Sequence, residues 1–179
     1  MVETKNKTKN VVDFMKDWDN VAIKSWLDKR RFNYSILCSN VKYDLNLGNV
    51  IRSGNIFLTK QVILYGRRKW DKRPAVGCFL YENLKFFGLD QLEELKAFVK
   101  GSRIIGLENS ENAKNIRTFD WKDDRHTILV IGQESEGICK ELLDLCEDVV
   151  YIKQFGATRC LNVASAAAIA MNEIANQLS

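Results

Sequence analysis

Short, continuous apolar runs recur along this chain, and segments with helical spacing separate several of them. The clearest runs are residues 34–38, 61–65, 103–107, 127–131 and 149–152. A strand that is apolar at every position is buried on both faces, which is typical of a parallel sheet covered by helices. The pattern therefore predicts an α/β fold, with a mostly parallel sheet and helices on both of its faces.

Helical periodicity predicts the remaining elements. Apolar residues recur at helical spacing in segments 11–27, 46–58, 89–99, 138–145 and 160–178. Residues 75–87 fit either a short strand or irregular structure, and residues 1–10 are polar enough to predict disorder. We expect two parts: a partly helical N-terminal extension, residues 1–32, and one α/β domain, residues 33–179.

Composition narrows the function classes. No apolar run approaches the ~18–20 residues of a membrane span, and the polar N-terminus lacks a signal-peptide core, so we expect a cytoplasmic protein. Five cysteines without a C-x-x-C pair argue against a disulfide framework and a zinc site. His126 is the single histidine, lies among charged residues and is predicted to be a solvated turn residue rather than a catalytic base. We expect no metal.

Positive charge is concentrated in two short segments, although the net charge is only +4. One is residues 29–31, and the other is the basic segment, residues 67–73, whose candidate RNA-binding residues are Arg67, Arg68, Lys69, Trp70 and Arg73. Phosphate backbones attract such clusters, and a tryptophan can stack on an unpaired base. The alternative is a solvated loop whose tryptophan is partly folded into the protein surface.

Glycine and polar side chains occur together at three junctions between an apolar strand and a helix. These are residues 46–52 (Asn-Leu-Gly-Asn-Val-Ile-Arg), 132–137 (Gly-Gln-Glu-Ser-Glu-Gly) and 156–163 (Gly-Ala-Thr-Arg-Cys-Leu-Asn-Val). Ligands of open α/β sheets bind at such junctions, because backbone N–H groups and helix ends point into the crevice there. The three segments therefore predict a ligand site.

The first segment offers two candidate residues. Asn46 stands where an N-cap is expected, at the start of a helix whose buried face holds Leu47, Val50, Ile51, Gly54 and Leu58. Arg52 lies off that face, so burial does not explain it. Simple capping by Asn46 and an exposed helix charge at Arg52 are the structural alternatives to a functional role.

In this order and with these spacings, the three segments resemble the three motifs of the SpoU (TrmH-like) branch of the SPOUT RNA methyltransferases. The resemblance covers about residues 33–179 and implies that they form a SPOUT methyltransferase domain with a deep C-terminal trefoil knot. It further implies S-adenosylmethionine as cofactor, a homodimer with sites near the subunit interface, and methylation of an RNA ribose 2′-hydroxyl. No large RNA-binding domain precedes residue 33, so we expect RNA recognition to use the dimer surface, the basic segment and the N-terminal extension. We expect tRNA in preference to rRNA.

The resemblance also implies roles for individual residues. Arg52 matches the leading catalytic arginine; since a guanidinium is a poor base, we expect it to clamp the target phosphate and ribose oxygen. Glu134 matches the carboxylate that orients this arginine, so a Glu134–Arg52 pair is expected. Asn46, Asn162 and Cys160 complete the catalytic candidates. The implied cofactor-binding residues are Leu107, Glu108, Gly132, Ile152 and Leu161.

The sequence departs from the family pattern in the third segment. Cys160 and Ala164 stand where the family commonly has serines, and Ile152 is followed by Lys-Gln instead of Pro-Met. A helix beginning near Cys160 would make its thiol more reactive. These departures support one alternative, a non-catalytic RNA-binding protein that keeps the fold. An enzyme with a nucleotide cofactor is the other, but no G-x-G-x-x-G turn or P-loop lysine occurs at a strand–helix junction.

Overall fold

A computed structural model describes residues 9–39, 41, 43–66 and 69–179. Most of the segment predicted to be disordered, residues 1–8 of 1–10, lies outside the described residues, and so do Arg67 and Arg68.

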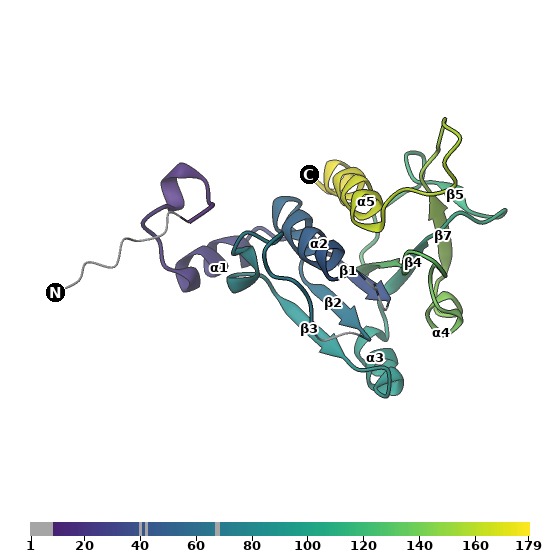
Figure 1. Ribbon diagram of the computed structural model, residues 1–179, viewed down its shortest axis with the longest axis horizontal. Coiled ribbons are helices and arrows are strands. Elements are labelled where there is room, and N and C mark those ends of the chain that lie inside the picture. The colour runs from purple at the N-terminus through teal and green to yellow at the C-terminus, as the bar shows by residue number, and fades with distance from the viewer. Residues whose placement is uncertain (1–8, 40, 42, 67–68) are drawn as a thin grey trace.

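The described residues form a seven-stranded sheet in the order β3-β2-β1-β6-β4-β7-β5. Every pair of neighbouring strands is parallel, which confirms the predicted sheet (Figure 1). All five apolar runs are strands. The strands are β1 (Tyr34–Ser39), β2 (Val62–Tyr65), β3 (Leu84–Phe87), β4 (Arg103–Leu107), β5 (Lys114–Asn115), β6 (Thr127–Ile131) and β7 (Asp148–Tyr151).

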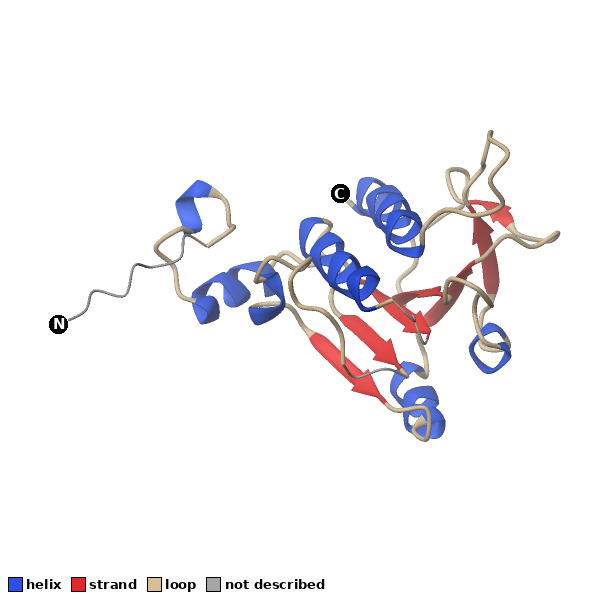
Figure 2. Cartoon of the chain, in the orientation of Figure 1, coloured by secondary structure: helices blue, strands red, loops and turns tan. Residues whose placement is uncertain are grey.

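The helices lie where helical periodicity predicts them but are shorter (Figure 2). They are α1 (Asn20–Asp28), α2 (Asp44–Ile56), α3 (Leu92–Val99), α4 (Lys140–Leu143) and α5 (Val163–Leu178), with 3-10 turns at Asp13–Met15 and Cys78–Leu80. The segment 11–27 is divided because the Asp19 carboxylate accepts a hydrogen bond from the Ala22 N–H (2.7 Å) and starts a new helix there.

Two apolar clusters cover the two faces of the sheet. Along β1, Ile36 and Cys38 join one cluster, which also contains buried residues of α1, α2 and α5. Leu37 points to the other face and packs in a second cluster with residues of α3 and α4. Helices therefore cover both faces, as expected, and α2 and α5 pack against each other on the first face. The trefoil knot stays a prediction from the family resemblance.

Strand order determines where a ligand can bind. From β1 the chain proceeds through α2 to β2 and β3 on one side, whereas β6 and β4 lie on its other side. Such a reversal opens a crevice beyond the carboxyl ends of the strands. All three polar segments follow the carboxyl ends of β1, β6 and β7, so they converge on this crevice.

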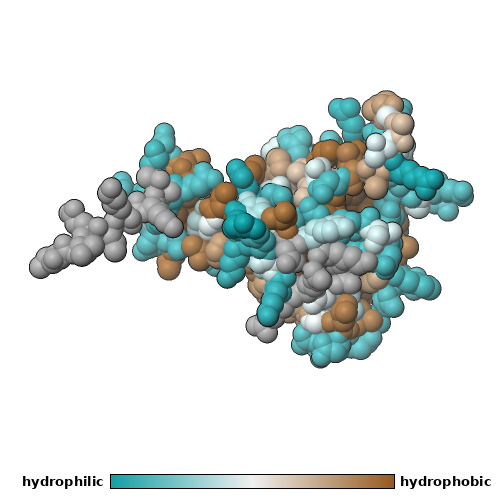
Figure 3. Space-filling model, viewed as in Figure 1, coloured by the Kyte–Doolittle hydropathy of each residue, from teal (hydrophilic) through white to brown (hydrophobic). Residues whose placement is uncertain are grey.

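The N-terminal extension shares the core of the sheet. Met15, Ile23 and Leu27 are buried in the cluster that contains α2 and α5. Phe14 and Val21, in contrast, are 57% and 77% exposed, and Figure 3 shows hydrophobic surface on this part of the molecule. The expected boundary at residue 32 stays a prediction, since the extension packs continuously onto the sheet.

Candidate functional site

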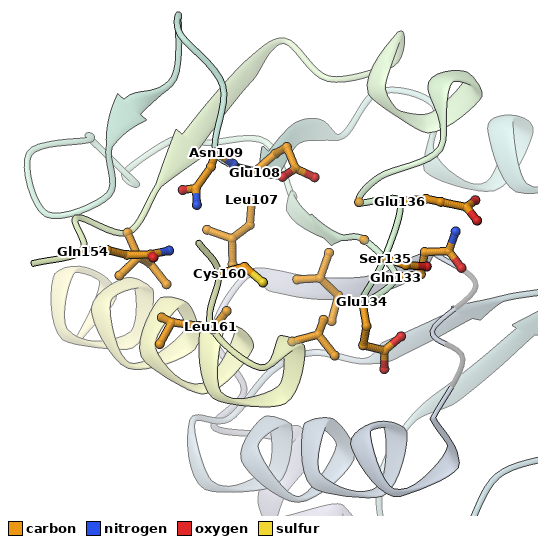
Figure 4. Close-up of a pocket in the computed structure, with 16 residues that line it drawn as sticks. Leu107, Glu108, Asn109, Gln133, Glu134, Ser135, Glu136, Gln154, Cys160 and Leu161 are labelled. Atoms are coloured by element: carbon orange, nitrogen blue, oxygen red, sulfur yellow. Dashed lines mark hydrogen bonds between the residues drawn. The ribbon is translucent and has the colours of Figure 1, made fainter. Parts of the chain in front are cut away.

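A cavity of about 380 Å³, the first cavity, opens beyond the carboxyl ends of β4, β6 and β7 (Figure 4). All five predicted cofactor residues line it, together with the catalytic candidates Glu134 and Cys160. Apolar side chains form one part of its wall, and polar loop residues form the rest. The lining residues used below are Leu107, Glu108, Asn109, Gly132, Gln133, Glu134, Ile152, Cys160 and Leu161.

The loop between β6 and α4 can close tightly because of two glycines. A Cβ on Gly132 would lie 2.1 Å from the carbonyl carbon of Gly137, so no larger residue fits there. Backbone hydrogen bonds in both directions between Gln133 and Gly137 (2.9 and 3.1 Å) hold the loop. Gly137 has φ +71°, in the left-handed region that favours glycine. It does not begin a helix, because α4 starts at Lys140.

Glu108 connects two walls of the first cavity. One of its carboxylate oxygens accepts a hydrogen bond from the Ile138 N–H (3.2 Å), and the other accepts one from the Asn109 N–H (3.1 Å). The carboxylate therefore ties the end of β4 to the loop after β6. Its described bonds are to the protein backbone, so Glu108 positions the cavity wall.

A chain of hydrogen bonds joins the three polar segments. The Asn46 Nδ2 donates to Glu134 Oε1 (2.5 Å), and the Asn46 Oδ1 accepts from Asn162 Nδ2 (3.1 Å). The Asn162 Oδ1 accepts from the backbone N–H groups of Ala164 (2.9 Å) and Ser165 (3.2 Å) and so caps α5. This connection, the Asn46–Glu134–Asn162 chain, has Asn46 as its middle member and fixes the relative positions of α2, α5 and the β6–α4 loop.

Two expectations about the first segment are wrong. Asn46 is not the N-cap of α2, because the helix begins two residues earlier at Asp44; its side chain instead bonds to Glu134 and Asn162. The expected Glu134–Arg52 pair is not formed, since Glu134 accepts from Asn46 and, more weakly, from the Tyr43 N–H (3.4 Å). Arg52 is exposed and has no hydrogen-bond or ion-pair partner within the described chain.

The third segment also differs from expectation at its helix. α5 begins at Val163 because the Asn162 side chain caps it, so Cys160 lies in the preceding loop and not at a helix N-terminus. Cys160 is exposed and lines the first cavity (Figure 4). No helix N-terminus therefore activates the Cys160 thiol, although Cys160 does lie beside the first cavity.

Side chains of the basic segment are more packed and more paired than the composition of the segment indicates. Trp70 is half-buried and packs edge-on against Phe79, with ring centroids 5.7 Å apart, as the alternative interpretation required. Arg73 pairs with Asp71 (2.5 Å) but stays exposed, as does Lys69. Arg67 and Arg68 lie outside the described residues. Within the described part of this segment, the exposed cations are Lys69, Lys72 and Arg73.

The basic cluster at residues 29–31 contains a buried arginine. The Arg31 guanidinium pairs with the Glu82 carboxylate (2.9 Å), and both side chains are almost fully buried. Arg31 also donates to the carbonyl oxygens of Thr59 (2.8 Å) and Tyr81 (3.1 Å). It is therefore part of the core and does not face an RNA backbone.

His126 is not a solvated turn residue. Its ring is half-buried, with Nε2 2.8 Å from Ser35 Oγ and Nδ1 3.0 Å from Asn33 Oδ1. Burial, together with the charge of Lys60, lowers the pKa of His126 to about 4. Across the described part of the chain, no three His, Cys, Asp or Glu side chains are grouped to hold a metal ion.

Sequence reasoning missed several polar residues of the site. Asn109, Gln133 and Gln154 line the first cavity, and the Gln133 Oε1 is buried without a hydrogen-bond partner among the described residues. Gln133 lies inside the second polar segment, so its position between Gly132 and Glu134 was an available signal. Asn109 could be found only through the strand order that brings β4 next to β6.

Comparisons with known proteins agree with this site. Residues 33–172 match the model of the SpoU rRNA Methylase family. The tRNA (guanosine(18)-2′-O)-methyltransferase of Aquifex aeolicus is 24% identical over 84% of this chain and 72% of its own. Among solved structures, the A. aeolicus TrmH/SpoU tRNA modifying enzyme gives a TM-score of 0.76, with 22% identity, over 88% of this chain and 81% of that one.

A second solved structure has a similar fold. An rRNA methyltransferase from Sinorhizobium meliloti, solved with AdoMet bound, gives a TM-score of 0.73 at 21% identity; the match covers 86% of this chain and 60% of that one. The family model covers most of the present chain. The chain therefore belongs to the SpoU rRNA Methylase family, which confirms the resemblance of the three polar segments.

Proposed function

We propose that this protein transfers a methyl group from S-adenosylmethionine to a ribose 2′-hydroxyl of RNA, and that the RNA is a tRNA. One observation carries the proposal: residues of the second and third family segments line the first cavity, and Asn46 of the first segment is hydrogen-bonded to both of these segments. Asn46 is buried, Glu134 is half-buried and Asn162 is exposed, and such a connected polar chain beside a cavity can hold catalytic groups in a fixed geometry.

The first cavity fits the proposed cofactor. Its volume of about 380 Å³ lies in the range of small-molecule sites, about 300–1,000 Å³. Leu107, Ile152 and Leu161 supply apolar surface for a flat adenine ring, and the neighbouring loops supply polar groups for hydrogen bonds. When bound, S-adenosylmethionine supplies a methyl group on a positively charged sulfur. The residues that hold it in this proposal are Leu107, Glu108, Gly132, Ile152 and Leu161.

Arg52 and the Asn46–Glu134–Asn162 chain have separate roles in the proposal. The exposed Arg52 guanidinium makes a bidentate contact with the target phosphate and the ribose 2′-oxygen. It stabilises the negative charge that develops on the ribose oxygen. The hydroxyl proton passes to water or to a phosphate oxygen of the RNA. Asn46, Glu134 and Asn162 hold α2 against the loops, so that Arg52 is presented at a constant position. Cys160 lies on the cavity wall beside the reacting groups.

The preference for tRNA is supported by the A. aeolicus relative, whose alignment spans most of this chain. Lys69, Trp70 and Arg73, together with Arg67 and Arg68, form the proposed RNA contact, in which Trp70 serves as part of the surface rather than as a free stacking ring. Access to tRNA places the protein in the cytoplasm in this proposal. No helix in the described residues is long and apolar enough to cross a membrane.

A homodimer is part of the same proposal. Several large apolar side chains stay exposed on or beside the paired helices α2 and α5: Leu45 (52%), Ile56 (62%), Leu161 (40%) and Ile169 (43%). Light scattering after size-exclusion chromatography should give twice the 20.6 kDa of one chain. A mass of one chain at micromolar concentration would contradict the dimer.

Methyl transfer from labelled S-adenosylmethionine tests the function. The acceptors are total tRNA and, separately, rRNA, both from cells that lack this protein, followed by digestion to nucleosides. We expect a labelled 2′-O-methylnucleoside in tRNA that is lost in Arg52→Ala and strongly reduced in Arg52→Lys, because lysine cannot bind two oxygens in the same plane. Arg117→Ala, which changes an exposed arginine outside the cavity, is the matched control and should retain activity.

The alternative function gives a different result. A non-catalytic RNA-binding protein would bind tRNA but transfer no label, and Arg52→Lys would bind as well as the parent chain. Full turnover in Arg52→Lys would contradict bidentate binding by Arg52. Label in rRNA alone would contradict the choice of tRNA while keeping the reaction class.

A further inference from the structure

Two glycines lie inside helix α2, although its backbone does not require them. Gly48 and Gly54 are both within the helix, and neither has the positive φ that favours glycine. A glycine inside a helix is less favourable than an alanine, because it loses more backbone freedom on folding. What distinguishes both positions is a close neighbour, and the two neighbours belong to different parts of the molecule.

Gly48 lies against the chain that connects β2 to β3. A Cβ on Gly48 would lie 2.7 Å from the carbonyl oxygen of Asp71 and 3.1 Å from two ring carbons of Pro74. A backbone oxygen and a proline ring cannot turn aside as the end of a long side chain can. Any side chain at position 48 would therefore push residues 71–74 away from α2.

The same connection continues along α2 toward Arg52, as Figure 1 shows for the chain between β2 and β3. Gly48 and Arg52 are one helical turn apart and so are neighbours on the same side of α2. The 3-10 turn Cys78–Leu80, at the far end of the connection, contacts α2. Burial raises the pKa of the Cys78 thiol to about 12, and the charge of Arg52 opposes this rise. The connection therefore passes both Gly48 and the surroundings of Arg52.

Contacts within the connection give it a defined shape. Trp70 packs edge-on against Phe79, and the Lys72 ammonium lies 5.2 Å from the centroid of the Phe79 ring. The Arg73 N–H donates to the Asp71 carboxylate (2.8 Å), which closes a tight turn beside Gly48. The connection can therefore move or stay as a unit. Its exposed cations, called the loop cations below, are Lys69, Lys72 and Arg73.

We propose that Gly48 is a positioning residue: its missing side chain lets the β2–β3 connection rest on α2, which holds the loop cations at a constant distance from Arg52. This proposal rests on the proposed RNA methyltransferase function. The loop cations bind phosphates beside the target nucleotide, and such contacts fix where a nucleic acid lies on a protein. A connection displaced from α2 loses these phosphates, whereas Arg52 and the first cavity stay unaltered.

Gly54 provides a matched control in the same helix. A Cβ on Gly54 would lie 2.9 Å from the Thr59 Oγ1 and 3.1 Å from a methyl carbon of Val62. This crowding is nearly as severe as at Gly48, but both neighbours are fully buried at the start of β2 and neither belongs to the β2–β3 connection. Gly54→Ala therefore lowers stability and leaves the loop cations in place.

Binding of labelled total tRNA, followed by fluorescence anisotropy at a series of salt concentrations, tests the proposal without requiring turnover. For the full-length Gly48→Ala protein we expect the Kd to rise about tenfold, and the slope of log K against log salt to become shallower by about one, as one phosphate contact is lost. Gly54→Ala should keep the parent Kd and slope while its melting temperature falls. Calorimetry should show nearly unchanged S-adenosylmethionine affinity in both variants, because neither glycine lines the first cavity.

Two further variants locate the effect. Pro74→Ala changes the same contact from the connection, leaves α2 unaltered, and should weaken tRNA binding about threefold, which keeps the proposal testable if Gly48→Ala does not fold. Gly48→Ala combined with Arg73→Ala should bind little more weakly than the weaker single variant, because both act through the loop cations. Fully additive effects would overturn the proposal. Parent tRNA affinity and salt slope in Gly48→Ala, or parent affinity in Pro74→Ala, would also overturn it.

The outcomes separate this proposal from the proposed function. Weaker and less salt-dependent tRNA binding by Gly48→Ala, without methyl transfer by the parent chain, would support the positioning role and contradict the enzyme activity. Methyl transfer by the parent chain with the same KM for tRNA in Gly48→Ala would do the reverse. If both proposals hold, Gly48→Ala should raise the KM for tRNA about tenfold and change kcat by less than about threefold.

Discussion

Hydrogen-bonded polar side chains form a group at each end of the parallel sheet, and the two groups differ in their burial and in their surroundings. Beyond the carboxyl ends, the Asn46–Glu134–Asn162 chain lies next to a cavity of about 380 Å³. Near the amino ends, Arg31 and Glu82 form an ion pair whose remaining bonds go to other protein groups. Arg31 also lines a cavity, of about 260 Å³. Neither burial of charge nor a neighbouring cavity identifies a functional site alone; only the carboxyl-end group connects the three family segments.

Helix α2 carries one asparagine into each group. Asn46, in its first turn, donates to Glu134, and Asn55, in its last turn, donates to Glu82, each at 2.5 Å. The two contacts have the same chemistry and nearly the same length. They differ in that Glu134 lines the first cavity, whereas Glu82 does not. This pair allows stability and activity to be separated by matched substitutions.

The largest effect on stability is expected from Arg31→Met. Burial raises the pKa of Glu82, and the charge of Arg31 opposes that shift. Removing the guanidinium leaves a buried carboxyl group without its cation, which typically costs about 3–5 kcal/mol. Urea denaturation should show this loss in the free energy of unfolding.

Two further variants control the Arg31 experiment. Lys140→Met breaks an exposed pair with Asp144 and should cost less than about 0.5 kcal/mol. Arg31→Met combined with Glu82→Leu should recover part of the loss, because no buried charge remains. If Arg31→Met lowered the free energy of unfolding no more than Lys140→Met does, the Arg31–Glu82 pair would not stabilise the fold.

Gly132→Ala should damage the carboxyl-end site. The added methyl group would overlap the Gly137 backbone, so the loop must open, at a cost of about 1–3 kcal/mol. Because this loop forms a wall of the first cavity, we expect S-adenosylmethionine affinity, measured by calorimetry, to fall at least about tenfold, a loss of 1.4 kcal/mol. Gly156→Ala is the control, since nothing lies within 4 Å of its added Cβ. Equal cofactor binding in both variants would mean that the loop is not a cofactor wall.

Asn46→Ala and Asn55→Ala test the comparison most directly. Each removes one donor from a buried or half-buried glutamate and should cost about 1–2 kcal/mol of stability. Only Asn46→Ala should also lower kcat for RNA methylation, by about 100-fold, because Arg52 and the loop lose their common anchor. A similar fall of kcat in Asn55→Ala would show that activity follows stability and not the site.

The fold was largely predictable, since every long apolar run is a strand of the parallel sheet. The elements that the sequence pattern did not predict correctly are either very short or are bounded by a side-chain cap. β5 has two residues, too few for any periodicity, and the Asp19 cap divides the first predicted helix. Pattern alone fixed neither the strand order nor the pairing of β1 with β6, because both depend on contacts between distant residues.

The candidate site was predictable in its residues and not in its contacts. Motif spacing named Asn46, Glu134 and Asn162, but the partner of Glu134 depends on how far α2 extends, and the helix begins earlier than expected. Arg31 and His126 were interpreted as exposed because their neighbours in sequence are charged. Local composition cannot show that the strands beside them bury their side chains.

The smallest effect expected concerns His126, at the amino end of β6. Burial lowers the pKa of His126 to about 4, so the folded protein keeps the ring neutral where an unfolded chain would bind a proton, at about 6.5. The stability from this group is therefore complete above pH 6.5 and is lost as the pH falls toward 4. Because the ring is only half-buried, water screens part of the penalty, and we expect the melting temperature to fall by roughly 2–4 °C between pH 7 and 5.

His126→Gln isolates this contribution from the other titrating groups. Glutamine can still bond to Ser35 and Asn33 but does not titrate, so its melting temperature should fall less over the same pH range than that of the parent chain. Parallel curves for the two proteins would mean that His126 titrates normally and is solvated. A steeper fall in the parent chain, with turnover at pH 7 equal in both, would place His126 with Arg31 among the residues that stabilise the amino end of the sheet and leave catalysis to the carboxyl end.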